Sequence, residues 1–418
     1  MKASESIPNF TPKLREYTNF ATRTIKKVCT EIGPRPCGSE EELKAQQFMA
    51  AQVGDAADEV HTENFTVHPG AFFGWMKIDA VLLLLAIACF AVGTLVDGLD
   101  FLCYISLALA AVAAAFMFGE FLFYKEFIDF MFKKKTSQNV YCVRKPSGEV
   151  KRRIIIGGHA DSSFEWRFTH LGGAPALYAS LISAAVGLVY MVAVGIVAIV
   201  TKGEYPDALA YVCFAFIPSF ICLFIFLNTK ISVQGANDNL TGCMCAAAVM
   251  KYMGDNNLRF ENTELWVLFS GGEEAGLRGA KAFAKAHKAE CEEVETMFMA
   301  LDTFRDDDDM FVYNRDMSGI TAHDKRCCSL VKKAAEYAGK ELKYSSIFCG
   351  ASDAAAITQA GIPSASLAAM NPGPPRYYHT RTDTWDNMNP RCVEKGIQIA
   401  LESAYLFDEK GLRDNYDD

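Results

Sequence analysis

The sequence predicts an α/β fold in which a mixed, mostly parallel sheet is sandwiched by helices and interrupted by two transmembrane helical hairpins. Two observations predict it. Short β-rich apolar runs alternate with helical patterns in the polar parts of the chain, which is typical of a parallel sheet covered on both faces. Four long apolar stretches divide those polar parts, and each approaches or exceeds the roughly 20 residues that a helix needs to cross a bilayer.

The elements of the sheet follow from hydrophobic periodicity. Buried strands are expected at 153–156, 265–269, 296–301 and 362–367. Helices are expected at 15–28, 241–253 and 277–289. Apolar and polar residues alternate in 57–68 and 138–143, which indicates an antiparallel edge of the same sheet.

The four apolar stretches are expected to form membrane helices at 78–96, 101–124, 174–200 and 208–227. Buried helices of a soluble domain seldom run this long without a polar stripe. Short, mostly acidic loops join them into two hairpins, whereas most of the lysines near their ends lie on the side of the polar segments. By the positive-inside rule the polar segments are cytoplasmic.

Each hairpin returns the chain to the side that it left, so the polar segments can assemble into one discontinuous domain. That domain is expected to comprise residues 1–71, 125–173 and 228–418. The first hairpin then comprises residues 72–124 and the second comprises residues 174–227.

Composition excludes several classes of function. A net charge of −9 with dispersed lysines and arginines argues against nucleic-acid binding, which needs a concentrated basic face. The 14 cysteines have no regular framework spacing, which favours a reduced, cytosol-facing protein. No charge lies in the middle of a span, and this argues against a transporter.

Five potential metal ligands lie close to the ends of expected strands or the start of an expected helix, where ligands gather in such sheets. They are His159, Asp238, Glu274, Asp302 and His379. A carboxylate shared by two cations, with one His and one further carboxylate on each side, holds metals roughly 3.5–4 Å apart for hydrolysis. Asp238 is the natural shared ligand, although by itself it is equally an ordinary helix N-cap.

Residues beside the ligands complete this hypothesis. Glu273 is left free to take a proton from water held between the metals. Asp161 lies two residues after His159 on an extended chain and can orient its ring, and Asp383 is a possible partner of His379. Tyr378 can donate its phenol to the oxyanion that forms during attack on a carbonyl.

The order and local wording of these motifs resemble the co-catalytic di-zinc exopeptidases, which include aminopeptidase Y, bacterial leucyl aminopeptidase and the glutamate carboxypeptidase relatives. The motifs are Gly157-Gly158-His159-Ala160-Asp161, Ala236-Asn237-Asp238-Asn239, Gly272-Glu273-Glu274, Leu301-Asp302 and Tyr378-His379. The resemblance covers roughly 10–70, 136–168 and 231–410, and Ser352-Asp353 resembles a family element near the substrate pocket. It departs where a hairpin fills the usually short gap between His159 and Asp238, and at Ala354, where the family often has His or a bulky group.

The resemblance implies the zinc exopeptidase fold and two Zn²⁺ ions. One zinc is expected on His159, Asp238 and Asp302, and the other on Asp238, Glu274 and His379, with Glu273 as the acid/base residue. It implies a membrane-bound metallopeptidase that trims peptide ends, with an aminopeptidase favoured. A carboxypeptidase, an amidohydrolase or glutaminyl cyclase-like enzyme, and a non-catalytic membrane receptor or scaffold remain open. The expected partners are a peptide substrate and the lipid bilayer, and the oligomeric state is left open.

Overall fold

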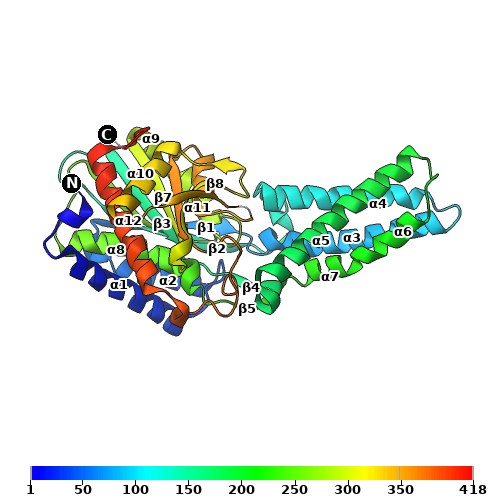
Figure 1. Cartoon of the computed structure of the whole chain (residues 1–418), viewed down its shortest axis with the longest axis horizontal. Coiled ribbons are helices and arrows are strands. Elements are labelled where there is room, and N and C mark those ends of the chain that lie inside the picture. The colour runs from blue at the N-terminus through cyan, green and yellow to red at the C-terminus, as the bar shows by residue number, and fades with distance from the viewer. Residues whose placement is uncertain (1, 348, 417–418) are drawn as a thin grey trace. The chain divides into compact units, whose positions relative to one another are not determined.

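The computed structural model describes residues 2–347 and 349–416, which fall into two units. Unit 1 comprises Met1–Pro69, Lys134–Phe164 and Ser232–Asp418, and unit 2 comprises Gly70–Lys133 and Glu165–Ile231 (Figure 1). Each unit is therefore assembled from segments that are distant in the sequence.

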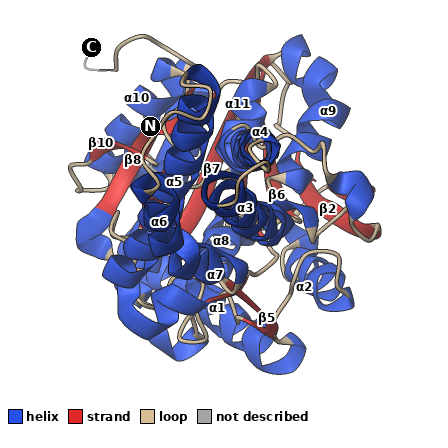
Figure 2. Ribbon diagram, turned by 90° about the vertical axis from the view of Figure 1, so that its right-hand side faces the viewer, coloured by secondary structure: helices blue, strands red, loops and turns tan. Residues whose placement is uncertain are grey.

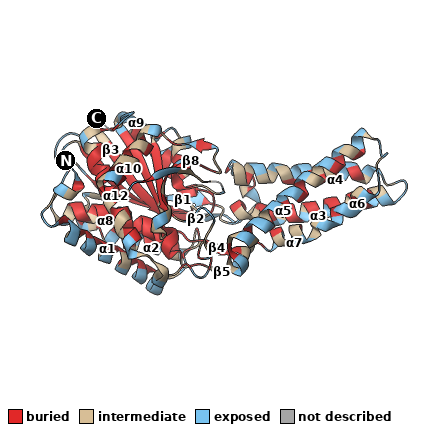
Figure 3. Cartoon of the chain, viewed as in Figure 1, coloured by how far each residue is buried: buried red, intermediate tan, exposed pale blue. Residues whose placement is uncertain are grey.

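A sheet of nine strands forms the centre of unit 1 in the part of the chain that the structure describes, and its central strands are buried (Figure 3). The order is β1-β2-β6-β3-β7-β11-β8-β10, with β9 beside β8. The strands are β1 (Glu59–Val67), β2 (Lys135–Arg144), β3 (Arg152–His159), β6 (Thr263–Ser270), β7 (Glu295–Phe304), β8 (Met310–Asp316), β9 (Thr321–Ala322), β10 (Lys343–Ser346) and β11 (Ser364–Ala369). The central strands β6, β3, β7 and β11 are parallel, whereas β1 and β2 pair antiparallel at one edge.

Helices cover both faces of this sheet (Figure 2). One layer consists of α1 (Phe10–Lys27), α2 (Glu40–Ala51), α8 (Thr241–Asp255), α10 (Lys325–Tyr337) and α12 (Pro390–Lys410). The other layer contains α9 (Arg278–Glu293) and α11 (Asp353–Gln359), which contact each other. The predicted mixed sheet between helices is therefore confirmed; its centre is parallel, and antiparallel pairs lie toward both edges.

The boundaries differ from those expected in informative ways. Strand β3 continues beyond its isoleucines to His159, so the first candidate ligand ends the strand instead of following it. Strand β7 likewise includes Asp302. The sequence did not indicate β8 or β10, which lie near the sheet edge: the apolar run of β8 is only four residues long, and β10 is polar.

Close approach of β3 to α8 depends on Gly158. A Cβ atom there would lie 2.8 Å from the backbone nitrogen of Cys243 and 3.0 Å from the carbonyl oxygen of Leu301. Both contacts are with backbone, which cannot swing aside as a side chain can. The Gly157-Gly158 pair therefore lets the start of α8 lie against the end of β3.

Unit 2 is mostly helical and contains α3 (Ala71–Leu95), α4 (Phe101–Phe116), α5 (Arg167–Val200), α6 (Ala208–Cys213) and α7 (Ile217–Phe224). The short strands β4 (Phe164–Trp166) and β5 (Leu227–Ser232) pair with each other where the chain passes between the two units. Small residues let the helices approach closely: a Cβ on Gly93 would lie 2.8 Å from the Cys103 sulfur, and the Ser106 hydroxyl donates to the Ala86 carbonyl (2.8 Å). Such packing is common between membrane helices.

Of the described helices, three are long and apolar enough to cross a membrane: Ala71–Leu95, Phe101–Leu122 and Arg167–Val200. Helix α5 has a non-helical residue at Gly173, so its apolar part begins near the expected residue 174. The fourth expected span, 208–227, is shorter than expected. Its apolar helix covers Ala208–Phe224, with a 3-10 stretch at Phe214–Phe216, and the chain then continues into β5.

We expect Gly158→Ala to destabilise unit 1, because its methyl group would meet backbone atoms of the Cys243 and Leu301 segments. Overpacking of this kind costs about 1–3 kcal/mol. Thermal unfolding of the detergent-purified protein should show a lower melting temperature than wild type. Gly54→Ala is the matched control, since a Cβ there meets nothing within 4 Å. Equal melting temperatures for the two variants would contradict the close approach.

Candidate metal centre

The five predicted ligands converge on one end of the sheet in unit 1. Because β6, β3 and β7 are parallel neighbours, their carboxyl ends lie side by side. His159 ends β3, Asp302 lies near the end of β7, and Glu274 follows β6. Asp238 lies in η7 (Ala236–Leu240), just ahead of α8, and His379 lies in the loop between β11 and α12.

The ligands form two clusters that share Asp238. His159, Asp238 and Asp302 make one, and Asp238, Glu274 and His379 make the other; within each cluster the candidate ligand atoms lie within 4.8 Å of one another. Asp238 Oδ1 lies 3.2 Å from His159 Nε2, and Asp238 Oδ2 lies 2.9 Å from His379 Nε2. One carboxylate therefore presents a different oxygen to each cluster, as a shared ligand must.

Acidic groups crowd this buried centre and perturb one another. Burial, followed by the charge of Asp238, raises the pKa of Asp302 to about 7. Burial also raises the pKa of Glu274. Burial disfavours the charged form of His379. The nearby carboxylates of Glu274 and Asp238 outweigh this effect and raise the pKa of the imidazole to about 10. Burial is the main cause for the two carboxyl groups, and the neighbouring carboxylates are the cause for the imidazole.

The residues present fit divalent metal. Imidazole nitrogens and carboxylate oxygens are the ligands that zinc takes in catalytic sites. Each cluster offers one imidazole and two carboxylates, and their donor atoms already face a common point. Bound cations would offset the repulsion between the buried carboxylates, which raises the pKa of Asp302.

Glu273 lies beside the centre but belongs to neither cluster. Its Oε2 is 3.9 Å from His159 Nε2, the nitrogen that also faces Asp238. Burial raises the pKa of Glu273 well above its usual range, and the charge of Glu274 acts in the same direction. A carboxylate held next to the ligand atoms without being one of them is suited to proton transfer.

Asp161 holds both His159 and the loop of Glu273. Its Oδ1 lies 3.4 Å from His159 Nδ1, on the side of the ring opposite the cluster. The same carboxylate accepts backbone N–H groups from Glu273 (3.0 Å) and Glu274 (3.1 Å). The expected contact with His159 is present, and the bonds to the acidic loop were not anticipated.

Asp383 was expected to orient His379, but its hydrogen bonds run to the loop of the shared ligand. It accepts from the backbone and side-chain nitrogens of Asn237 (both 2.8 Å) and from the backbone nitrogen of Asp238 (3.1 Å). The peptide bond between Asp238 and Asn239 is cis. Asp383 therefore fixes the backbone at Asn237 and Asp238.

Tyr378 stacks on His379, with ring centroids 3.9 Å apart and an interplanar angle of 18°. His379 itself adopts a left-handed φ of 51°, which is uncommon for a residue with a side chain and is often found at functional sites. The Ser352-Asp353 element also lies close, because the Ser270 hydroxyl at the end of β6 donates to the buried Asp353 carboxylate.

Sequence reasoning missed Glu42 and Arg35, both fully buried next to this centre. Arg35 donates to the carbonyl oxygens of Ala160 (2.7 Å), Gln234 (2.7 Å) and Gly235 (3.0 Å), which joins the loop after β3 to the loop before Asp238. The sequence offers a local signal only for Arg35, which lies between two prolines; Glu42 is the third of three consecutive glutamates that begin α2.

The sheet between helices and the paired clusters match the expected zinc exopeptidase fold. Solved structures agree on the fold. An aminopeptidase from Aneurinibacillus sp. strain AM-1 aligns with a TM-score of 0.55 at 17% identity, covering 93% of this chain and 93% of that one. A zinc aminopeptidase from Bacillus subtilis aligns with a TM-score of 0.55 at 15% identity, covering 93% of this chain and 94% of that one.

Residues 222–404 match the model of peptidase family M28. This match and the shared fold support a zinc peptidase-like function for the chain. A glutaminyl cyclase from Bacteroides thetaiotaomicron shares the fold as well, with a TM-score of 0.53 at 14% identity over 93% of this chain and 97% of that one. Comparison with curated protein sequences gives no significant match.

Proposed function

We propose that the protein is a membrane-bound aminopeptidase that uses two zinc ions. The observation that carries this proposal is the division of Asp238 between two clusters, with one oxygen toward His159 and the other toward His379. A site for a single ion needs only one such cluster. The second cluster, with His159 and Asp302, supports a paired centre of the kind used for hydrolysis.

Bound zinc would polarise the scissile carbonyl and make water more acidic. The chain's own residues supply the proton transfers and the orientation. Glu273 takes a proton from the attacking water and returns it to the amine that leaves, since its carboxylate lies beside His159 of the first cluster. Tyr378 donates its hydroxyl to the oxygen that becomes negative, and Asp161 keeps the ring of His159 in place.

The proposal that residues are removed from amino termini rests on the likeness to the two solved aminopeptidases. Cyclisation is the second candidate, because a glutaminyl cyclase has a similar fold. The complete His159, Asp238 and Asp302 cluster favours hydrolysis, because the resemblance associates cyclases with a single zinc. A peptide that begins with Gln separates the two: a peptidase releases glutamine, and a cyclase releases only ammonia.

We expect the zinc-loaded protein to shorten peptides one residue at a time from their amino termini. Glu273→Gln should slow this by about 10²- to 10⁴-fold, the usual contribution of a general base, while retaining zinc. Mass spectrometry of a defined peptide mixture measures both. Shortening from carboxyl termini would make the protein a carboxypeptidase, and a fully active Glu273→Gln variant would overturn the assignment of the base.

Metal content tests the paired centre separately from activity. Wild type should retain two zinc ions per chain after dialysis, measured by elemental mass spectrometry. Asp302→Ala should retain one, because the cluster of Asp238, Glu274 and His379 stays intact, whereas Asp238→Ala damages both clusters and should lose both ions. Equal zinc content in the two variants would contradict a shared ligand.

We also propose that unit 2 spans the bilayer and that unit 1 is cytoplasmic. Long apolar helices with exposed side chains, such as Val189 (68% exposed) and Val200 (74% exposed), support membrane insertion. The distribution of lysines supports the orientation.

We expect impermeant thiol reagents to label Asp97→Cys and Glu204→Cys in intact cells, since both positions are exposed in the loops between helices. Cys349 is the internal control, because it is an exposed thiol of unit 1 and should react only after the membrane is permeabilised. Labelling of Cys349 alone in intact cells would reverse the orientation.

A further inference from the structure

Glu42 is a buried acid for which the proposed reaction gives no use. Its side chain is 0% exposed and extends from the first turn of α2, whereas its neighbour Glu40 is exposed. A buried carboxylate is costly unless it accepts hydrogen bonds or binds a cation. Its partners therefore indicate its role.

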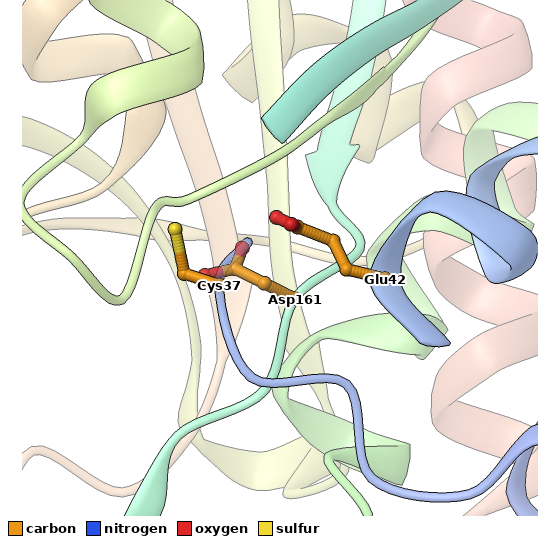
Figure 4. A group of neighbouring side chains, drawn as sticks. All are labelled: Cys37, Glu42 and Asp161. Carbon is orange, nitrogen blue, oxygen red and sulfur yellow. The ribbon is translucent and has the colours of Figure 1, made fainter. Parts of the chain in front are cut away.

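Glu42 lies in a buried group with Cys37 and Asp161, whose donor atoms are within 4.8 Å of one another (Figure 4). The group has the composition of a cation site, but the carboxylates are already used. Glu42 Oε1 accepts from the Gly272 nitrogen (2.8 Å) and the Ser137 hydroxyl (3.0 Å), and Oε2 accepts from the Gly38 nitrogen (2.6 Å). The Glu42 carboxylate therefore acts as a hydrogen-bond acceptor.

The two carboxylates hold three consecutive amides of the acidic loop. Glu42 takes the N–H of Gly272, and Asp161 takes those of Glu273 (3.0 Å) and Glu274 (3.1 Å). The loop can adopt this path because residue 272 is glycine: its φ is +63°, and a Cβ there would lie 2.9 Å from the Cys37 sulfur. Glu42 therefore holds the start of the backbone loop that carries Glu273 and Glu274.

Helix α2 also holds the strand that leads into this loop. Gln46, one turn beyond Glu42, donates to the carbonyl oxygens of Gln138 (2.7 Å) and Phe269 (3.0 Å). Phe269 belongs to β6, which ends at Ser270 just before the loop. One face of α2 therefore contacts both the strand end and the loop.

We propose that Glu42 is a positioning residue, which fixes the Gly272 amide so that the Glu273 carboxylate faces the metal centre. This inference rests on the proposed role of Glu273 as the base. Misplacement of a reacting group by about 1 Å can cost about 10²-fold in rate. Glu42 acts through the backbone, so it should affect kcat more than the binding of substrate or zinc.

The test compares Glu42→Gln with Glu40→Gln in the full-length, zinc-loaded protein. The Glu42→Gln substitution keeps the shape of the side chain but turns an amide N–H₂ group toward the Gly272 or Gly38 N–H. We expect faster hydrogen exchange in a peptide covering 271–274 and about a tenfold or greater fall in kcat. KM and zinc content should stay within about twofold, and Glu40→Gln should match wild type. Unchanged exchange and kcat in Glu42→Gln would overturn the proposal.

Ser137→Ala is the second variant if Glu42→Gln does not fold, because it removes one hydrogen bond from Glu42 without burying a new polar group. The same exchange increase, with a smaller fall in kcat, is expected, and unchanged exchange would overturn the proposal. Exchange does not depend on turnover. A wild-type protein that binds zinc but cleaves no peptide would refute the proposed function. Hydrogen exchange would then still test the contact between Glu42 and the Gly272 amide. An active wild type with an unaffected Glu42→Gln variant would refute the role of Glu42 alone.

Discussion

The central constraint on this structure is the concentration of negative charge at the carboxyl end of its sheet. Asp238, Glu274 and Asp302 are brought within reach of two imidazoles, and burial raises the pKa of Asp302 to about 7. The imidazoles of His159 and His379 lie beside Asp238 and Glu274. The surrounding chain fixes the backbone that carries these acids: Asp161 accepts two amides of the acidic loop, and Asp383 accepts three N–H groups from Asn237 and Asp238.

Parallel strands explain why segments so far apart in the sequence meet at one point. The ends of β6, β3 and β7 are adjacent, and the glycines after the isoleucines of β3 let α8 approach them. The long insertion between His159 and Asp238 is compatible with this arrangement, because most of it folds within unit 2 and the chain then returns to unit 1. An insertion whose ends lie close together does not disturb the residues on either side of it.

The sequence allowed prediction of the sheet and of the five residues that converge at the candidate metal centre, because apolar runs followed by glycine or acid mark strand ends. It did not reveal Glu42, which follows two other glutamates at a helix start, where acids are favoured for their effect on the helix dipole. Only tertiary contacts distinguish the buried residue from its neighbours. The end of the fourth span was placed three residues too late for a similar reason, since hydropathy alone did not show that the chain pairs as a strand from Leu227.

The shared role of Asp238 is the claim on which the paired centre, the base and the positioning residues all depend. X-ray absorption spectroscopy of the zinc-loaded protein tests it most directly, because it reports the distance between metal ions. A shared carboxylate predicts zinc–zinc scattering at roughly 3.5–4 Å. Two bound zinc ions per chain without scattering in that range would contradict a shared ligand.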